Sequence, residues 1–214
     1  MTLGGWLDRV LYRRPFEGRG AHRYATSERP AFGDLDDRIL DGMPTLATAR
    51  RLLDLGAGPG TFASLAAARH PALTVIAVDP SRDFAHCLPA ARTQVVRAAG
   101  EALPLATGSI DAAICLSSIR HVRDRAASLR ELRRVVRAQG SLVIVELDPD
   151  ASRDRIAAHA DHIDSLLLRR AFGPLVCKTA PHASMILDLA TRAGWQLVAQ
   201  RPDPIQPVYI LELA

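Results

Sequence analysis

Residues 52–61 constrain this chain most. They read LLDLGAGPGT, an apolar run that breaks into three alternating glycines and then passes into a helical pattern. This order predicts a strand, a tight turn and a helix. Glycine permits positive φ and lets a ligand approach the backbone, and the first N–H groups of a helix are free to bind polar ligand atoms. We therefore expect a nucleotide-type binding loop, the alternative being a tight turn that binds nothing.

The glycines Gly56, Gly58 and Gly60 follow the spacing G-x-G-x-G, whereas dinucleotide-binding loops have G-x-G-x-x-G. This difference disfavours a nicotinamide-dependent oxidoreductase. An acidic residue does stand at the expected distance, because Asp79 closes the apolar strand pattern of residues 73–78. A carboxylate at the carboxyl edge of a strand can accept hydrogen bonds from both hydroxyls of a ribose. The alternative for Asp79 is an exposed loop position without a ligand.

Further segments follow in a fixed order: 99–105 reads AGEALPL, 116–122 reads LSSIRHV, and 132–144 reads LRRVVRAQGSLVI. Together with residues 54–60 and 78–79, they resemble the class I S-adenosylmethionine-dependent methyltransferases. The resemblance is greatest to the small-molecule group that includes ubiquinone- and menaquinone-type C-methyltransferases. It covers residues 50–148. Two positions depart from the pattern of many relatives, Ala99 in place of Asp and Gln139 in place of Pro.

The resemblance implies an α/β fold, a Rossmann-like doubly wound seven-stranded and mostly parallel sheet with a C-terminal antiparallel hairpin strand. It also implies S-adenosyl-L-methionine as cofactor and S-adenosyl-L-homocysteine as product. Carried over position by position, the cofactor-binding residues are Asp54, Gly56, Ala57, Gly58, Gly60, Asp79, Pro80, Gly100, Glu101, Ala102, Leu116 and Ser117. Because Ala99 lacks a carboxylate, we expect the backbone to supply the adenine contact there.

Strand and helix patterns alternate along the chain, which is typical of a parallel sheet covered by helices on both faces. We expect strands at 51–56, 73–79, 94–98, 110–116 and 141–147, and helices at 61–69, 82–91 and 124–138. Apolar residues at helical spacing predict a further helix over 156–167, and another covers 184–192. Residues 195–199 and 208–211 predict the closing hairpin.

Residues 1–45 have a different pattern, in which arginines and aromatic residues alternate between glycines and prolines. A nucleic-acid-binding arm is one interpretation. We favour an N-terminal helical lid over residues 1–45 that closes on the cofactor and excludes water, with the methyltransferase domain at 46–214.

Methyl transfer is an in-line displacement that requires alignment and desolvation more than a strong acid or base. If a base is needed, His121 is the best candidate, because ligands of such sheets bind outside the carboxyl ends of the strands. A locally bonded loop histidine is an equal alternative. Tyr24 on the lid is a second candidate, and His22 and Asp148 are weaker ones. A metal site is not expected: the i, i+3 pair of histidines at 159 and 162 has no visible fourth ligand.

The composition fits one soluble domain. The chain has 214 residues, of which 48% are hydrophobic and 23% charged. Its pI of about 9.4 reflects arginines scattered among acidic residues, so we expect no nucleic-acid partner and read the arginines of residues 130–137 as a solvated helix face. Three cysteines without metal spacing and the lack of a long uncharged apolar segment favour a cytoplasmic protein with no membrane association. The oligomeric state is not readable.

Three function classes follow. The leading one is transfer of a methyl group from S-adenosylmethionine to a small-molecule acceptor. The second is an S-adenosylmethionine-binding protein of the same fold that is non-catalytic or catalyses a non-methylating reaction, and the third is a nucleotide-binding oxidoreductase. After the fourth strand the chain reads Ser117-Ser118-Ile119-Arg120 and lacks the Asn/Asp-Pro-Pro-aromatic motif of base-directed N-methyltransferases, which disfavours a nucleic-acid amine as acceptor.

Overall fold

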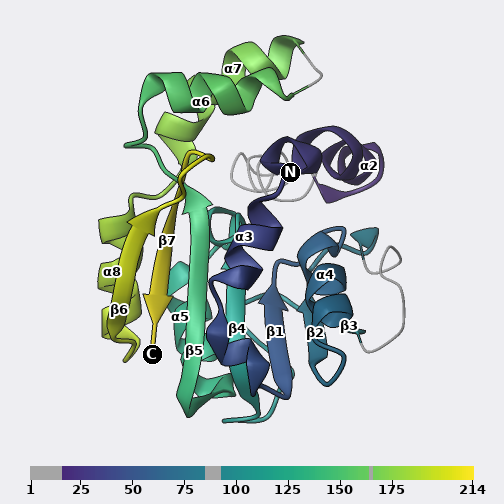
Figure 1. Cartoon of the computed structure of the whole chain (residues 1–214), viewed down its shortest axis with the longest axis vertical. Helices are drawn as coiled ribbons and strands as arrows, with labels where there is room; N and C mark the ends of the chain where they lie inside the picture. Colours follow the sequence, from purple (N-terminus) through teal and green to yellow (C-terminus); the bar gives the residue numbers. More distant parts are fainter. Residues whose placement is uncertain (1–15, 85–92, 164–165) are drawn as a thin grey trace, which may run out of the picture.

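A computed structural model of the chain describes residues 16–84, 93–163 and 166–214. These residues form a seven-stranded sheet in the order β3-β2-β1-β4-β5-β7-β6 (Figure 1). All neighbouring pairs from β3 to β5 are parallel, whereas β7 runs antiparallel to both β5 and β6. The strands are β1 (Arg51–Leu55), β2 (Thr74–Val78), β3 (Thr93–Val96), β4 (Ile110–Leu116), β5 (Val136–Leu147), β6 (Leu197–Pro202) and β7 (Val208–Leu213). The predicted fold class is confirmed, including the hairpin strand inserted beside β5.

Helices cover both faces of this sheet because its strands are apolar on both sides. Even-numbered residues of β1 and β4, such as Leu52 and Ile114, pack with the helices that precede β1 and with α4. Odd-numbered residues such as Leu53 and Cys115 pack with α5 and α8 on the other face. The α-helices are α2 (Arg19–Arg23), α3 (Leu35–Asp41), α4 (Thr61–Arg69), α5 (Arg125–Val135), α6 (Arg153–Asp161), α7 (Leu166–Thr179) and α8 (Ala183–Arg192).

Most element boundaries agree with the expected ones, and two helices differ. Helix α5 ends at Val135 rather than at 138, because the chain already pairs with β4 at Val136. A Cβ at Gly140 would lie 2.4 Å from the Val136 side chain and 2.7 Å from the Asp111 carbonyl, so this irregular start of β5 requires glycine there. The helix predicted over 156–167 is divided between α6 and α7. The helix expected at 82–91 falls mostly outside the described residues.

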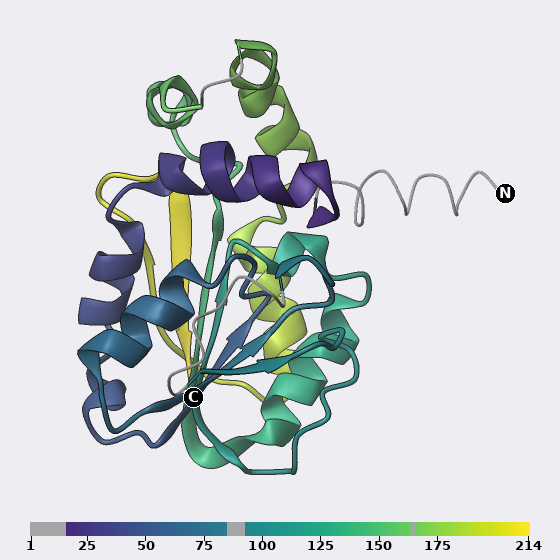
Figure 2. The same ribbon diagram turned by 90° about the vertical axis from the view of Figure 1, so that its right-hand side faces the viewer.

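The segment of residues 16–47 has two parts, which pack against different regions of the sheet. Residues 16–32 form α2, a π-helix (Tyr24–Glu28) and a 3₁₀ helix (Arg29–Phe32), which cross the carboxyl end of the sheet below α6 and α7 (Figure 2). Helix α3 and the next turn pack against the sheet instead, where Leu35, Ile39 and Leu46 are buried in the same core as β1. The part of the expected lid that lies over the sheet edge is therefore residues 16–32, and residues 1–15 of that segment lie outside the described residues.

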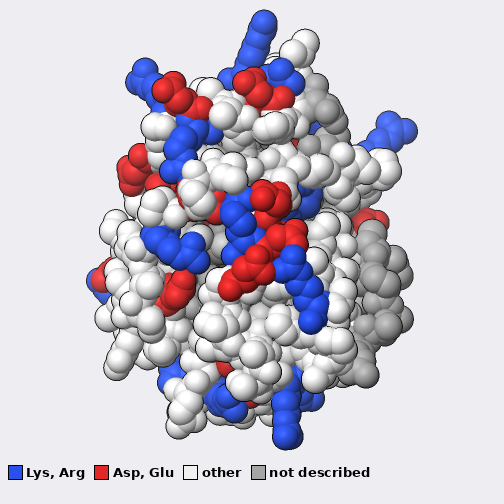
Figure 3. All heavy atoms as spheres, in the orientation of Figure 1, with Lys and Arg blue, Asp and Glu red and all other residues white. Residues whose placement is uncertain are grey.

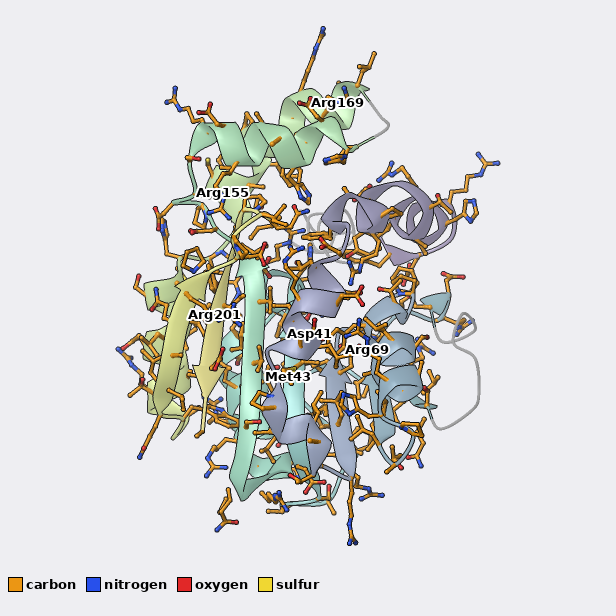
Figure 4. The ribbon with its side chains drawn as sticks, viewed as in Figure 1. Asp41, Met43, Arg69, Arg155, Arg169 and Arg201 are labelled. Atoms are coloured by element: carbon orange, nitrogen blue, oxygen red, sulfur yellow. The ribbon has the colours of Figure 1, made fainter. Side chains whose placement is uncertain are left out.

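The hairpin loop between β6 and β7 joins these upper elements. The Gln206 side chain donates to the carbonyls of Ala31 and Phe32, at 3.4 and 3.1 Å, and its Oε1 lies 2.6 Å from Nδ1 of His159 on α6. Arg155, labelled in Figure 4, extends from α6 toward the same loop and donates to the carbonyls of Asp203 and Gln206. One buried amide thus connects the N-terminal segment with α6. No helix among the described residues is long and apolar enough to span a bilayer.

Candidate functional site

The site lies where the strand order reverses, between β1 and β4. Connections leave these two strands in opposite directions, which opens a crevice outside their carboxyl ends. The two loops touch at Gly56 and Ser118, where a Cβ on Gly56 would lie 2.4 Å from the Ser118 Cβ. The Ser118 hydroxyl donates to the Leu55 carbonyl at 2.7 Å. Gly56 is therefore required by the close approach of the β4 loop.

The glycine loop that the sequence predicts has the expected positive φ angles. Gly56, Gly58 and Gly60 have φ of 72°, 54° and 80°, in the region that favours glycine. Gly58 differs from Gly56, because a Cβ on Gly58 would contact only the rings of Tyr24 and Phe84, at 3.8 and 3.9 Å. Gly60 is the left-handed N-cap of α4. Gly58 therefore lines the cavity without a close approach of another backbone, and a side chain there would extend toward the aromatic rings.

Asp79 lies at the end of β2 and faces this loop. One carboxylate oxygen accepts from Gly58 N at 2.9 Å and the other from Ser81 N at 2.8 Å. A carboxylate offers about four lone-pair positions, so two acceptor positions remain for further donors. Burial raises the pKa of Asp79, and the two backbone donors oppose that effect. Asp79 fixes the glycine loop and still presents acceptors to the crevice.

The loop after β3 is held by α5. A Cβ on Gly100 would lie 2.6 Å from the Ser128 hydroxyl on that helix. Arg134 donates to the carbonyls of Leu103 and Leu105, at 3.0 and 2.8 Å, and pairs with Glu131. Glu101 accepts from the N–H groups of residues 123 and 124, both at 3.0 Å. The arrangement is rigid and brings residues 99–101 to the crevice wall.

The arginines of residues 130–137 agree only in part with the solvated helix face that the sequence predicted. Arg130 is exposed, whereas Arg134 holds the loop above and the Arg133 guanidinium lies 5.1 Å from the Trp195 ring centroid. Arg137 lies on β5 rather than on α5 and pairs with Asp111 at 2.9 Å. Trp195 is buried and donates from its indole N–H to the Leu129 carbonyl. Periodicity alone did not show these partners, because they come from distant parts of the chain.

A cavity of about 750 Å³ occupies the crevice. Nine of the predicted site residues line it, namely Tyr24, Gly56, Gly58, Asp79, Pro80, Gly100, Glu101, Ser117 and His121. Five do not, namely Asp54, Ala57, Gly60, Ala102 and Leu116. Sequence reasoning did not single out several lining residues, among them Phe16, Leu55, Ser81, Phe84, Arg97 and Val122. The only signal in the sequence for several of these residues is that they adjoin the recognised motifs along the chain.

Two polar groups near the cavity are buried without partners among the described residues. Oδ2 of Asp54 is one, and Oγ of Ser117 is the other. Desolvation, together with the charge of Asp36, raises the pKa of Asp54 to about 7, and Arg29 opposes this effect. Ser117 has φ of 49°, a conformation that non-glycine residues rarely adopt and that is frequent at functional sites. Unpaired buried groups are costly, so both positions are suited to a ligand that supplies partners.

Aromatic rings form the wall opposite the glycine loop. Phe16 packs edge-on against Tyr24 and His121, with ring centroids 5.4 and 4.7 Å apart, and Tyr24 lies 6.1 Å from Phe84. Tyr24 begins the π-helix, a rare element that is frequent at functional sites. Burial raises the pKa of the Tyr24 phenol above its ordinary value. This wall comes from three separate segments of the chain.

His121 lines the cavity at the end of the short turn after β4. Its Nε2 accepts from Arg120 Nε at 2.9 Å. Burial and the charges of Arg120 and Arg125 lower the pKa of His121 well below its ordinary value, so the ring is neutral at neutral pH.

The weaker candidates do not line the cavity. His22 is exposed, and Asp148 accepts a hydrogen bond from the N–H of Asp150. His159 is buried between the rings of Phe32 and Phe172 and bonded to Gln206.

Comparison with known proteins agrees with this geometry. Residues 53–144 match the family described as methyltransferase domain. Over these residues the chain is similar to methyltransferase domains. Over 109 residues it is 38% identical to the ubiquinone/menaquinone biosynthesis C-methyltransferase UbiE of Geotalea uraniireducens, a match that covers 47% of this chain and 46% of that protein. The matched region thus spans about half the length of this relative.

Solved structures extend the likeness to nearly the whole chain at the level of the fold. An S-adenosylmethionine-dependent methyltransferase from Aquifex aeolicus aligns with a TM-score of 0.72 at 13% identity, covering 91% of this chain and 96% of that one. The cyclase SpnF aligns with a TM-score of 0.63 at 18% identity, covering 84% and 78%. At these identities the comparison shows a shared fold only.

The residues present fit S-adenosylmethionine, the cofactor of this domain class. The cavity-lining backbone at Gly58, the remaining acceptor positions of Asp79 and the unpartnered oxygen of Asp54 suit a ligand that carries a ribose and an ammonium group. Each lies on or beside the switch-point loops.

Proposed function

We propose that this chain transfers a methyl group from S-adenosylmethionine to a small-molecule acceptor by in-line displacement. The observation that carries the proposal is the glycine loop, which is bonded to Asp79 at the end of β2 and faces a cavity of about 750 Å³ with an aromatic wall. The match of residues 53–144 to methyltransferase domains supports it. A cavity of this size accommodates a nucleoside cofactor together with part of a small acceptor.

The chain's own residues would act by binding, orientation and exclusion of water. Asp79 would accept from the ribose hydroxyls, Asp54 would face the ammonium group, and the residues around Gly100 would line the adenine side. The cofactor supplies a methyl group on a sulfonium whose positive charge disappears during transfer. Removing water from such a reaction favours the less charged transition state, and Phe16 and Tyr24 are placed to do so.

A second candidate is a non-methylating reaction on the same fold. The shared fold of the cyclase SpnF supports it, since that protein's name describes a different reaction. In-line methyl transfer requires no obligatory catalytic side chain, so the residues of the site serve either function equally. Only detection of the transferred methyl group separates the two.

The partner we propose is a small molecule rather than nucleic acid, and the compartment is the cytoplasm. Basic and acidic side chains lie side by side on the face seen in Figure 3, without a continuous basic field. Arg69 pairs with Asp41 at 2.6 Å, and Figure 4 labels both residues. Arg38 pairs with Asp203 at 2.9 Å. Neutralised arginines contribute little to phosphate binding. Cys115 and Cys177 are free thiols, as is usual in a reducing compartment.

The test is a methylation assay with methyl-labelled S-adenosylmethionine and fractionated metabolite extracts. Gly58→Val should abolish cofactor binding and label transfer, because its side chain fills the approach to the loop. Gly108→Val is the matched control: Gly108 has φ of 65° in a turn where a Cβ meets nothing within 4 Å. Both variants carry similar backbone strain, but only one obstructs the site.

Equal binding by the two valine variants would reject the glycine loop as the cofactor site. Cofactor binding without label transfer to any fraction would favour the second candidate. Titration with a nicotinamide cofactor tests the oxidoreductase alternative, which predicts an affinity for that ligand at least equal to that for S-adenosylmethionine.

A further inference from the structure

Three side chains, Glu146 of β5 and Arg120 and His121 of the turn after β4, form a series of contacts that ends at the cavity. Glu146 of β5 is fully buried, and its Oε1 lies 3.7 Å from Nε of Arg120. That same Nε donates to Nε2 of His121 at 2.9 Å. Only His121 of the three lines the cavity. The roles proposed above for the site use neither Arg120 nor Glu146.

The contacts of Glu146 and Arg125 hold this series of three side chains in place. Its two carboxylate oxygens accept from the N–H groups of Leu147 at 2.8 Å and Arg120 at 3.2 Å. The Arg125 guanidinium donates to the carbonyls of Ile119 and Arg120, at 3.2 and 3.1 Å, and so fixes the turn from the other side. The Arg120 side chain is 18% exposed and is held against a carboxylate with no exposure.

This arrangement determines which nitrogen of His121 carries the proton. Arginine remains protonated in proteins and only donates, so Nε2 has to be the acceptor. A neutral imidazole that accepts at Nε2 carries its hydrogen on Nδ1. Among the residues that the structure describes, none bonds Nδ1, and that atom is not sealed from the cavity as the unpartnered buried groups are. The ring therefore offers a donor to whatever occupies the site.

We propose that Arg120 and Glu146 are positioning residues that hold His121 as a neutral Nδ1–H donor to the methyl acceptor. The acceptor class that fits carries a carbonyl, phenolate or enolate oxygen close to the atom that is methylated, and it needs no proton removed by His121. This part of the proposal rests on the proposed function, whereas the tautomer of His121 does not. It replaces the general-base role considered for His121 from the sequence.

The tautomer is tested on the cofactor-free full chain by ¹⁵N NMR of the histidine rings, with His121→Asn identifying the signals. We expect the Nδ1–H form in the wild type, unchanged from pH 6 to pH 8. Arg120→Met should abolish this preference, and Arg120→Lys should restore part of it because lysine is again a cationic donor. Glu146→Gln should weaken it, and the exposed-arginine control Arg170→Met should leave it unchanged. An Nε2–H or cationic ring in the wild type overturns the proposal.

A second arm uses activity once an acceptor is known. The amide of Asn can donate from nearly the position of Nδ1 but cannot act as a base. We expect His121→Asn to keep kcat within about tenfold of the wild type and His121→Ala to lose more than the Asn variant does. If both substitutions lower kcat by about 10²–10⁴-fold, and the wild-type rate rises with pH, His121 is a general base and the proposal fails. The groups that face His121 are Arg120 and Arg125, with Glu146 behind Arg120.

The NMR and activity measurements distinguish failure of the positioning role from failure of the proposed function. A wild-type Nδ1–H tautomer without methyl transfer to any acceptor would reject the proposed function while leaving the positioning role of Arg120 intact. The opposite result, transfer with an Nε2–H ring, would retain the function and reject the positioning role.

Discussion

At the scale of single residues, the burial of ionised Asp54 without a hydrogen-bond partner for Oδ2 in the described part of the chain destabilises the ligand-free protein at high pH. Asp54 is 2% exposed, its Oδ2 has no partner among the described residues, and its pKa is about 7. A carboxyl whose pKa is higher in the folded than in the unfolded protein binds its proton more tightly when folded. The free energy of unfolding therefore falls as pH rises from about 4 to about 7 and stays low above that range.

Asp54→Asn should remove this pH dependence. Compared with the wild type, the variant should gain more stability at pH 8 than at pH 5, by a few kcal/mol at most, since a tenfold change in acidity is about 1.4 kcal/mol. Urea unfolding at the two pH values measures the difference, which cancels any pH-independent cost of the unpaired amide. The same variant should bind S-adenosylmethionine more weakly. An equal effect of the substitution at both pH values would show that Asp54 titrates normally.

At the scale of elements, the cavity depends on contacts between segments far apart in the sequence. Gln206 of the β6–β7 loop joins the carbonyls of the N-terminal segment to His159 on α6. Gln206→Ala leaves several buried polar groups without partners, which should cost about 1–3 kcal/mol of unfolding free energy. Hydrogen exchange should rise in residues 29–32 and α6 and remain unchanged in β4. Gln196→Ala, on the far side of the same hairpin, is the control, and uniform exchange across all elements would contradict this role of Gln206.

At the scale of the whole molecule, cofactor binding and folding should be coupled. A ligand at about 100 times its Kd stabilises a protein by about 2.7 kcal/mol, which raises the Tm of a chain of this size by about 5–11 °C. Asp79→Asn keeps the side-chain size but removes the charge that strengthens its hydrogen bonds. We expect it to weaken binding by about 1.5–3 kcal/mol, so the same cofactor concentration should give about half of the wild-type thermal shift or less. Thermal melts with S-adenosylhomocysteine test this, and a full shift in the variant would remove Asp79 from the cofactor contacts.

The sequence by itself determined the sheet and the glycine loop, because both depend on local patterns. Apolar runs such as residues 110–116 must be buried on both faces, and Gly56, Gly58 and Gly60 have positive φ in the structure as their spacing predicted. The position of Asp79 at the carboxyl edge of the sheet also followed, since parallel strands end at the same edge.

Only the tertiary structure decided which side chains meet across that edge. The contacts of Phe16 with His121, Arg134 with the Leu103 carbonyl, and Gln206 with the Phe32 carbonyl join residues that lie 105, 31 and 174 positions apart along the chain. The proton on His121 depends on Arg120, whose direction is set by buried Glu146 on another strand. Local propensity carries no information about such pairs, because their free energy arises when packing brings the segments together and removes water from between them.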